Sequence, residues 1–219
     1  MGSKIKKQFM SFAGVPVIVH TLKKITSFPL IDGIILVVPE KDMDFCHDNI
    51  LVPHGFDLQV TMVKGGRERQ DSVKNGLLKI KKCTSFSGNV LVMIHDGVRP
   101  FADHLLMERC IKGAIEHHGA CIPAIPVHDT LKKADDRGFV LNTISRDHLY
   151  QVQTPQVFDL DLIIGAYDHA EKNNFSGTDD ASLVENSGSR VFMVKGSKKN
   201  IKITTREDFL LADAFHACL

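Results

Sequence analysis

The 219-residue sequence lacks an excess of charge of either sign. It contains 27 Lys and Arg residues against 26 Asp and Glu residues, which gives a formal net charge of +1. A protein that binds nucleic acid or an anionic membrane surface through its overall charge carries a basic excess. The sequence therefore predicts neither kind of partner, and any anionic ligand must be bound by a local basic cluster.

Long apolar runs are also absent. No segment approaches the roughly 18 consecutive apolar residues of a membrane-spanning helix, and the first residues, MGSKIKKQF, lack the apolar core of a signal peptide. We therefore expect the protein in the cytoplasm.

Paired cysteines are missing. Cys46, Cys83, Cys110, Cys121 and Cys218 show neither C-x-x-C pairing nor metal-ligand spacing. Their odd number suits a reducing compartment, and they are interpreted as mostly buried thiols rather than as metal or redox sites.

Short apolar runs alternate with longer stretches of helical period. The apolar runs predict strands at 31–38, 58–63, 90–94, 120–127, 191–194 and 201–204. Apolar residues at three- and four-residue spacing predict helices at 16–27, 71–82, 103–118, 160–173 and 205–216. Continuous rather than alternating apolar runs are typical of strands covered on both faces. The sequence thus predicts one α/β domain over 1–219 with a mostly parallel sheet.

Polar residues indicate where two of these helices begin. Thr205 followed by Asp208 resembles a capping box, and Asp71 and Ser72 are candidate N-caps.

Residues 128–155 interrupt the alternation with short polar strands around a D-D-R-G turn. This pattern predicts a β-hairpin arm that projects from the sheet. Because an isolated hairpin is barely stable, such an arm usually packs on a second subunit.

The first candidate site is the stretch VKGGRERQDSV, residues 63–73. Gly65 and Gly66 close a strand, and Arg67, Arg69 and Ser72 follow where a helix begins. Glycines let backbone amides approach a ligand, and a helix N-terminus favours anionic groups. An ordinary turn is the alternative interpretation.

The second candidate is IHDGVRPF, residues 94–101, where a strand ends in His95, Asp96 and Arg99. Ligands of open α/β sheets bind beyond the carboxyl ends of the strands. A carboxylate there is suited to a hydrated Mg²⁺ that bridges phosphates. Alternatively, Asp96 and Arg99 form an ion pair that fixes a loop.

The third candidate brackets the arm with Thr130, Lys132, Arg146 and Thr154. An arginine fork and threonine hydroxyls suit phosphate, although on a hairpin they also fit a solvated polar face.

Two further stretches lie near the C-terminus. Lys202 alternates with Ile201 and Ile203, so it is expected to project to the opposite face of the sheet, into solvent or a site. In TDDASLVE, residues 178–185, helix capping and complementarity to the helix dipole explain most of the carboxylates.

Seven motifs follow one another in a recognisable order. They are Gly65-Gly66 with Arg69 and Ser72-Val73, H-D-x-x-R-P, P-V-x-D-T-x-K, a downstream Arg, T-P-Q, T-D-[DE]-A-S and N-I-K-[IV]-T. Together they resemble the 2-C-methyl-D-erythritol 4-phosphate cytidylyltransferases over almost the whole chain. The ribitol 5-phosphate cytidylyltransferases are similar, but the D-T-L-K and T-D-D-A-S versions favour the methylerythritol family.

The resemblance implies a Rossmann-like homodimer whose arm swaps against its partner. It implies a Mg²⁺-dependent attack by a sugar-alcohol phosphate on the α-phosphate of CTP. Such transfers need positioning and charge neutralisation more than covalent chemistry.

The resemblance also implies roles for individual residues. The nucleotide would contact Gly65, Gly66, Arg69 and Ser72. The methylerythritol phosphate would contact Asp96, Arg99, Thr130, Arg146, Thr154 and Thr178, with Asp96 near the metal and the arm residues supplied by the other subunit. Lys7 and Lys202 would stabilise the transition state.

The start of the sequence departs from the family pattern. The family opens with a strand and a glycine-rich loop, A-A-G-x-G-x-R-M-G, whereas this sequence opens at Met1-Gly2-Ser3. Lys6 also stands where the family has proline. We expect further residues before Met1, with a natural truncation as the alternative. A non-catalytic nucleotide-binding homodimer is the corresponding alternative function.

Overall fold

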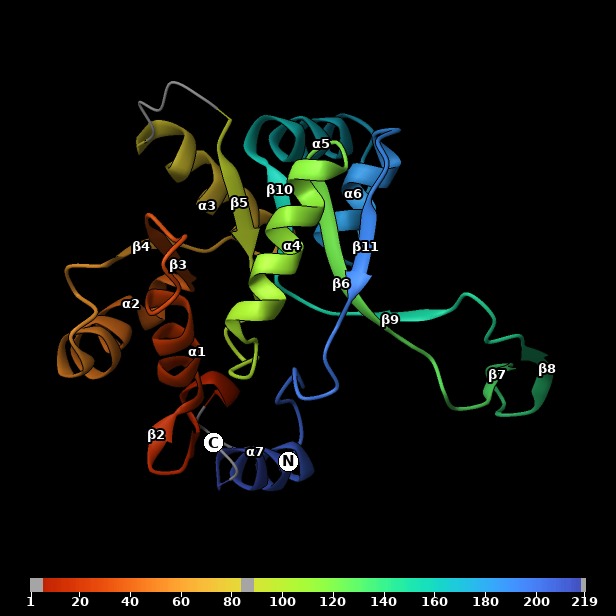
Figure 1. Cartoon of the computed structure of the whole chain (residues 1–219), viewed down its shortest axis with the longest axis horizontal. Helices are drawn as coiled ribbons and strands as arrows, with labels where there is room; N and C mark the ends of the chain where they lie inside the picture. The colour runs from red at the N-terminus through yellow and green to blue at the C-terminus, as the bar shows by residue number, and fades with distance from the viewer. Residues whose placement is uncertain (1–5, 84–88, 218–219) are drawn as a thin grey trace.

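The computed structural model describes residues 6–83 and 89–217, so Cys218 lies outside the described residues. Helices and strands alternate along most of the chain and form layers around a sheet (Figure 1). The predicted α/β class is therefore confirmed.

The largest sheet contains five strands. Four of them follow the order β11-β6-β10-β5, and β9 pairs with β6 outside this path. The strands are β5 (Leu91–Ile94), β6 (Ala120–Pro126), β9 (Tyr150–Val152), β10 (Gln156–Asp159) and β11 (Phe192–Lys195). β10 runs antiparallel to both of its neighbours, β5 and β6, and β11 runs parallel to β6. β5, β6 and β11 therefore share one direction, and the amino end of β10 lies at their carboxyl edge.

Two further strands form a separate parallel pair. β3 (Ile34–Val38) pairs with β4 (Val60–Lys64). Within residues 6–83 and 89–217, this pair has no strand pairing with the larger sheet.

Five helices lie close to their predicted positions. They are α1 (Val17–Thr26), α3 (Arg69–Cys83), α4 (His104–Glu116), α5 (Leu160–Lys172) and α7 (Arg206–Ala217). Short helical segments that were not predicted are η1 (Lys7–Phe9), α2 (Met43–Cys46) with the turns around it from Glu40 to His54, and α6 (Asp180–Asn186). A short hairpin, β1 (Ser11–Phe12) with β2 (Val15–Pro16), was not predicted either.

The sheet separates two apolar clusters, as the alternation along β10 shows. Phe158 packs in a cluster with α5 residues such as Ile163, whereas Val157 packs with α4 residues such as Leu106. Successive strand residues point to opposite faces, so β10 is covered on both sides. This burial fixes the register of β10 and, with it, the position of the residues that precede the strand.

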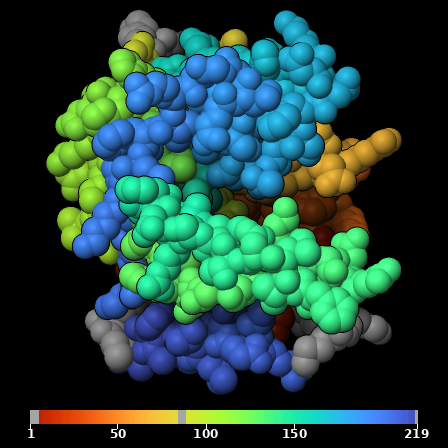
Figure 2. Space-filling view, turned by 90° about the vertical axis from the view of Figure 1, so that its right-hand side faces the viewer, coloured from red at the N-terminus to blue at the C-terminus, as the bar shows by residue number. Residues whose placement is uncertain are grey.

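The predicted arm is present. β7 (Leu131–Ala134) pairs with β8 (Val140–Ile144), and the hairpin projects from the body of the molecule (Figure 1). Seen from the arm side, the hairpin crosses the face of the molecule above α7 (Figure 2). Phe139, Val140 and Leu141 of the arm are 70%, 59% and 59% exposed.

The strand predicted at 201–204 is wrong. This segment is irregular, and its backbone contact with the neighbouring loop is one hydrogen bond, from the Ile203 N–H to the Val98 carbonyl (2.9 Å). Ile203 is fully buried with Phe12 and Ala212, so its apolar character serves packing against α7 and not a strand.

The expected helix starts are confirmed in one case and wrong in the other. Thr205 and Asp208 form the reciprocal capping contacts at α7, with the Thr205 N–H donating to Asp208 Oδ2 (2.7 Å). Asp71 and Ser72 are not N-caps, because α3 already begins at Arg69. Asp71 instead accepts the Glu68 N–H from within the first turn (3.1 Å).

The described helices include none that is long and apolar enough to cross a membrane.

Candidate functional site

A charged cluster lies beyond the carboxyl end of β5. Asp96 Oδ2 is 3.2 Å from Arg99 Nε and 3.1 Å from Lys202 Nζ. The Asp96 and Arg99 side chains are 14% and 12% exposed, whereas that of Lys202 is 46% exposed. Burial alone would raise the pKa of Asp96, but Lys202 and Arg99 outweigh it and lower that pKa below its usual range. Asp96 is therefore a carboxylate at neutral pH, and Lys202 offers its charge to solvent or ligand.

A chain of hydrogen bonds joins this cluster to Thr154, two residues before β10. The Asp96 N–H donates to Thr154 Oγ1 (3.1 Å), and Thr154 Oγ1 lies 3.0 Å from His95 Nδ1. His95 Nε2 lies 3.0 Å from the Arg99 carbonyl, which can only accept, so Nε2 carries the proton. Burial lowers the pKa of His95 to about 4. The imidazole is thus neutral, and Thr154 donates to its Nδ1.

The glycine pair forms a closed turn after β4. The Gly65 N–H donates to the Val38 carbonyl (2.7 Å), and the Gly66 N–H donates to Ser72 Oγ (3.0 Å). A Cβ added to Gly66 would lie 2.1 Å from the Asp71 Cβ, so this position requires glycine. Gly66 and Ser72, two of the residues predicted to contact the nucleotide, are therefore hydrogen-bonded to each other in this structure.

Arg69, also predicted to contact the nucleotide, is paired with a buried carboxylate. Arg69 Nη2 lies 2.6 Å from Asp180 Oδ2, and the Tyr167 hydroxyl donates to Asp180 Oδ1 (2.5 Å). Burial lowers the pKa of Arg69, but the hydrogen bond and charge of Asp180, with a contribution from Asp96, raise it above its usual value. This pair joins the first residue of α3 to the start of α6.

The interpretation of the TDDASLVE stretch is confirmed for Asp179, which caps α6 by accepting the Ser182 N–H (3.0 Å). Asp180 lies in the first turn of α6, where a carboxylate complements the helix dipole. Its side chain is fully buried and is bonded to Arg69 and Tyr167, which the interpretation did not include.

Of the residues predicted for the site, the structure brings together Asp96, Arg99, Thr154 and Lys202. Arg69 lies close enough for the charge of Asp96 to contribute to its raised pKa. The other predicted residues have no hydrogen bond or ion pair with this cluster among the described interactions. Lys7 is exposed in η1, and Thr178 is exposed before α6. Thr130 and Arg146 are exposed on the arm, where Arg146 donates to the His128 carbonyl. Lys132 Nζ donates across the hairpin to Thr143 (2.6 Å).

Asp96 is the carboxylate of this cluster that could bind a divalent cation. In the described part of the chain, no group of three or more His, Cys, Asp or Glu side chains could hold a metal ion. Mg²⁺, however, is commonly bound through one or two carboxylates together with substrate phosphates. Asp96 supplies one such carboxylate, so the residues fit a cation shared with a phosphorylated substrate but not a protein cage.

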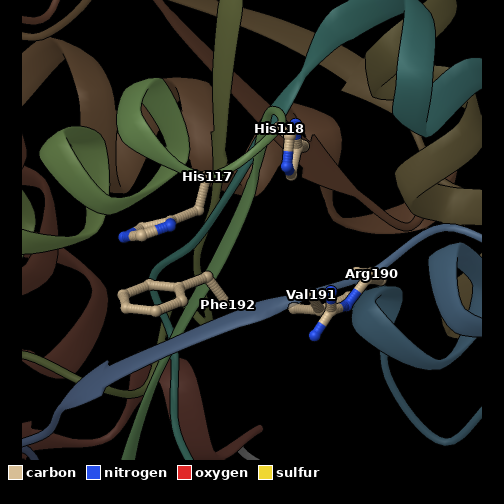
Figure 3. A pocket seen from close by; sticks show the side chains of 5 residues that line it. All are labelled: His117, His118, Arg190, Val191 and Phe192. Atoms are coloured by element: carbon tan, nitrogen blue, oxygen red, sulfur yellow. The ribbon is translucent and has the colours of Figure 1, made fainter.

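A cavity of about 240 Å³ lies elsewhere, between the end of α4 and the start of β11. It is lined by His117, His118, Arg190, Val191 and Phe192, with the His117 ring stacked on Phe192 at 3.5 Å (Figure 3). It lies at the amino ends of β6 and β11, opposite to the edge that holds Asp96. Ligands of such sheets bind at the carboxyl edge, so this cavity is not the candidate site.

Sequence reasoning missed several buried polar residues around the cluster. Gln153, Gln156, Asp180 and Asn200 are 6%, 1%, 0% and 0% exposed. Gln156 donates to Asp179 Oδ2 (2.7 Å) and accepts the Ala181 N–H (3.1 Å). Gln156, Asp180 and Asn200 lie inside the T-P-Q, T-D-D-A-S and N-I-K-I-T motifs, and Gln153 immediately precedes the first of them. These positions were the signal in the sequence.

Comparison with known proteins agrees with the motif order. A family profile described as 2-C-methyl-D-erythritol 4-phosphate cytidylyltransferase matches residues 1–217. The chain is 46% identical over 215 residues to the protein of that name from Syntrophus aciditrophicus, covering 98% of the chain and 89% of the relative. It is 42% identical to the protein of that name from Geobacter metallireducens over 215 residues, covering 98% and 91%.

Solved structures give the same result. The 4-diphosphocytidyl-2C-methyl-D-erythritol synthase of Anaerococcus prevotii is similar with a TM-score of 0.82 and 35% identity, covering 99% of this chain and 92% of that one. The 2-C-methyl-D-erythritol 4-phosphate cytidylyltransferase of Thermus thermophilus is similar with a TM-score of 0.79 and 29% identity, covering 96% and 94%.

Proposed function

The chain belongs to the 2-C-methyl-D-erythritol 4-phosphate cytidylyltransferase family, and from this premise we propose how its residues carry out the family's reaction. The protein transfers CMP from CTP to 2-C-methyl-D-erythritol 4-phosphate and releases pyrophosphate, a step of isoprenoid precursor synthesis. Its fold is the Rossmann-like α/β fold of this family. The family match favours this substrate over ribitol 5-phosphate and favours an enzyme over a non-catalytic nucleotide-binding protein.

The observation that supports the residue roles is the Asp96–Arg99–Lys202 cluster at the carboxyl edge of the sheet. In the reaction, a phosphate oxygen of the sugar alcohol forms a bond to the α-phosphorus of CTP, and the bond from that phosphorus to the pyrophosphate oxygen breaks. Negative charge on the phosphate oxygens increases and is offset by fixed cations. We assign this role to Lys202 and, from the exposed η1 turn, to Lys7.

The remaining residues are assigned to one of the two substrates. We assign the binding of CTP to Gly65, Gly66, Arg69 and Ser72. Arg69 acts there chiefly by fixing the turn, because its guanidinium is paired with Asp180. Ligand binding to Gly66 or Ser72 would replace the hydrogen bond that joins them. We assign the binding of methylerythritol phosphate to Arg99, Thr154 and Thr178.

Mg²⁺ is the cation of this proposal, and Asp96 is the residue that would hold it. When bound, it would neutralise phosphate charge and orient the phosphates. Arg99 and Lys202 keep Asp96 ionised, which a metal ligand requires.

The arm supports a homodimer. Thr130 directly precedes β7 and Arg146 follows β8, and the hairpin of these two strands projects from the body of the molecule (Figure 1). The apolar side chains of Phe139, Val140 and Leu141 are largely exposed in the single chain. A large exposed apolar surface marks an interaction site. We therefore propose that the arm packs on a second copy and contributes Thr130 and Arg146 to the partner's site.

The same proposal places the enzyme in the cytoplasm. The described cysteines Cys46, Cys83, Cys110 and Cys121 are all free thiols, which suits a reducing compartment.

The reaction is tested by mixing the protein with CTP, Mg²⁺ and methylerythritol phosphate and measuring pyrophosphate. Mass spectrometry should identify the cytidine diphosphate derivative of methylerythritol. Parallel reactions with ribitol 5-phosphate, and with a chelator instead of Mg²⁺, should release little pyrophosphate. Equal or faster release with ribitol 5-phosphate would overturn the substrate, and full activity with chelator would overturn the metal.

A further inference from the structure

Two buried side-chain amides hold the loop that leads to Lys202. Gln153 precedes Thr154 and is 6% exposed, and Asn200 ends the loop 196–200 and is fully buried. We call these two side chains the amide clasp. Neither touches the Asp96 carboxylate, and neither has a role in the residue assignments above.

Gln153 makes three hydrogen bonds to the loop. Its Nε2 donates to the Ser197 carbonyl (2.8 Å) and to the Asn200 carbonyl (3.3 Å), and its Oε1 accepts the Ser197 N–H (3.1 Å). The loop approaches so closely that a Cβ on Gly196 would lie 2.6 Å from Gln153 Oε1. Gln153 thus holds both ends of the loop 196–200.

Asn200 joins the end of the loop to Thr154 and to Arg99. Its Nδ2 donates to the Thr154 carbonyl (2.8 Å), and its own carbonyl accepts from Arg99 Nη1 (2.9 Å). These two hydrogen bonds fix the backbone at Asn200, two residues before Lys202. One residue after Lys202, the Ile203 N–H is bonded to the Val98 carbonyl and its side chain is fully buried.

The hydrogen-bonding groups of the Asn200 side chain are only partly satisfied within the described residues. Its Oδ1 is buried and has no hydrogen-bond donor in the described part of the chain. A buried unsatisfied polar atom destabilises a fold, whereas an apolar side chain of similar shape would not. The contact that the Asn200 side chain does make is the hydrogen bond from Nδ2 to the Thr154 carbonyl, and this bond fixes the backbone at the end of the loop.

We propose that Gln153 and Asn200 are positioning residues that hold Lys202 against Asp96. A lysine side chain is long and flexible, and Lys202 is half exposed, so its ion pair with Asp96 depends on where its backbone is fixed. The clasp supplies that fixed point. This inference rests on the role of Lys202 proposed above.

The test is a double-mutant cycle between the clasp and Lys202 in the full chain. Gln153→Met keeps the side-chain size and removes the three hydrogen bonds. We expect kcat to fall by about 10- to 100-fold, as small displacements of catalytic groups do, with the KM values for both substrates changed less than about threefold. In a Lys202→Met background, adding Gln153→Met should lower kcat little further, since residues that act through one another are not additive.

The matched control is Gln156→Met. Gln156 is equally buried and also makes side-chain hydrogen bonds, but to Asp179 and Ala181 and not to the loop. Its effect on kcat should be the same factor with and without Lys202. If Gln153→Met also lowered kcat by the same factor in both backgrounds, the clasp would be merely structural and the proposal overturned.

A second variant covers the case in which Gln153→Met does not fold. Asn200→Leu removes one hydrogen bond, to the Thr154 carbonyl, and the unsatisfied Oδ1 with it. Its thermal stability should therefore fall less than that of Gln153→Met, which removes three hydrogen bonds. Asn200→Leu should still lower kcat, and again only when Lys202 is present. Failure of the Lys202 role gives a different result, because Lys202→Met alone would then leave kcat unchanged.

Discussion

At the scale of single residues, the half-exposed amine of Lys202 carries the charge that we assign to the reacting phosphate. Lys202→Met should lower kcat by about 10²–10³, because loss of one preorganised charge contact costs about 3–4 kcal/mol of transition-state stabilisation. Lys198→Met is the control, since Lys198 is exposed and surface substitutions stay within about 0.5 kcal/mol of neutral. Steady-state pyrophosphate release measures both variants. Equal turnover by the two would show that Lys202 is a solvated loop residue.

Arg69 allows a test of stability at the same scale. Arg69→Met would leave the fully buried Asp180 carboxylate without its cation. Loss of one partner of a buried pair costs about 3–5 kcal/mol, and because Arg69 is 43% exposed we expect the lower part of that range. Urea unfolding measures this loss. Arg67→Met, at an exposed side chain of the same turn, should leave the unfolding free energy nearly unchanged, and a similar result for Arg69→Met would contradict the role of the pair.

At the scale of elements, His95 joins the end of β5 to the start of β10 through Thr154. Burial lowers the pKa of His95 to about 4, whereas an unfolded histidine has a pKa of about 6.5. Between these values the unfolded chain binds a proton that the folded chain does not. The free energy of unfolding should therefore decrease as pH falls from about 6.5 to about 4, and this group contributes no change above that window.

Urea unfolding at about pH 7 and about pH 5 measures this effect, which we expect to be roughly 2 kcal/mol for His95. His95→Gln should weaken the pH dependence by that amount. His128→Gln, at an exposed position on the arm, should retain it. The assignment to His95 is wrong if both variants keep the wild-type slope.

The elements differ in how far the sequence could predict them. The five long helices were predicted because their apolar spacing extends over several turns. β10 was missed because Gln156–Asp159 is short, follows Pro155 and begins and ends with polar residues. The alternation of Ile201 and Ile203 was misleading, because Ile203 packs beneath α7 without strand pairing.

The same limit applies to the candidate site. Asp96, Arg99 and Lys202 belong to recognisable motifs, so their proximity could be anticipated. The pairing of Arg69 with Asp180, and of Gln153 with the loop 196–200, joins residues far apart in the chain. Which distant residues meet depends on the order of the strands in the sheet. That order could not be predicted from the single sequence.

At the scale of the whole molecule, the arm predicts sites that are shared between two chains. Arg146→Ala and Lys202→Met should each be nearly inactive alone, because one removes a group from the arm and the other a group from the sheet edge. After the two variants are unfolded together and refolded, half of the dimers should be mixed. One of the two sites in each mixed dimer is then intact, so about a quarter of wild-type activity should return. No recovery, with mixed dimers verified by mass, would show that each chain supplies its own arm residues.

The position of β10 in the sheet also determines how much of the chain must be synthesised before the sheet can form. β10 lies between β5 and β6 although it follows both in the chain. A nascent chain that ends within the arm therefore has β5 and β6 but not the strand that joins them. Unpaired strand edges promote association between chains, and folding intermediates with such edges aggregate. The ribosome must release residues 156–159 before these two strands can belong to one sheet, so the interval during which the arm is translated is when the growing chain is most open to misassembly.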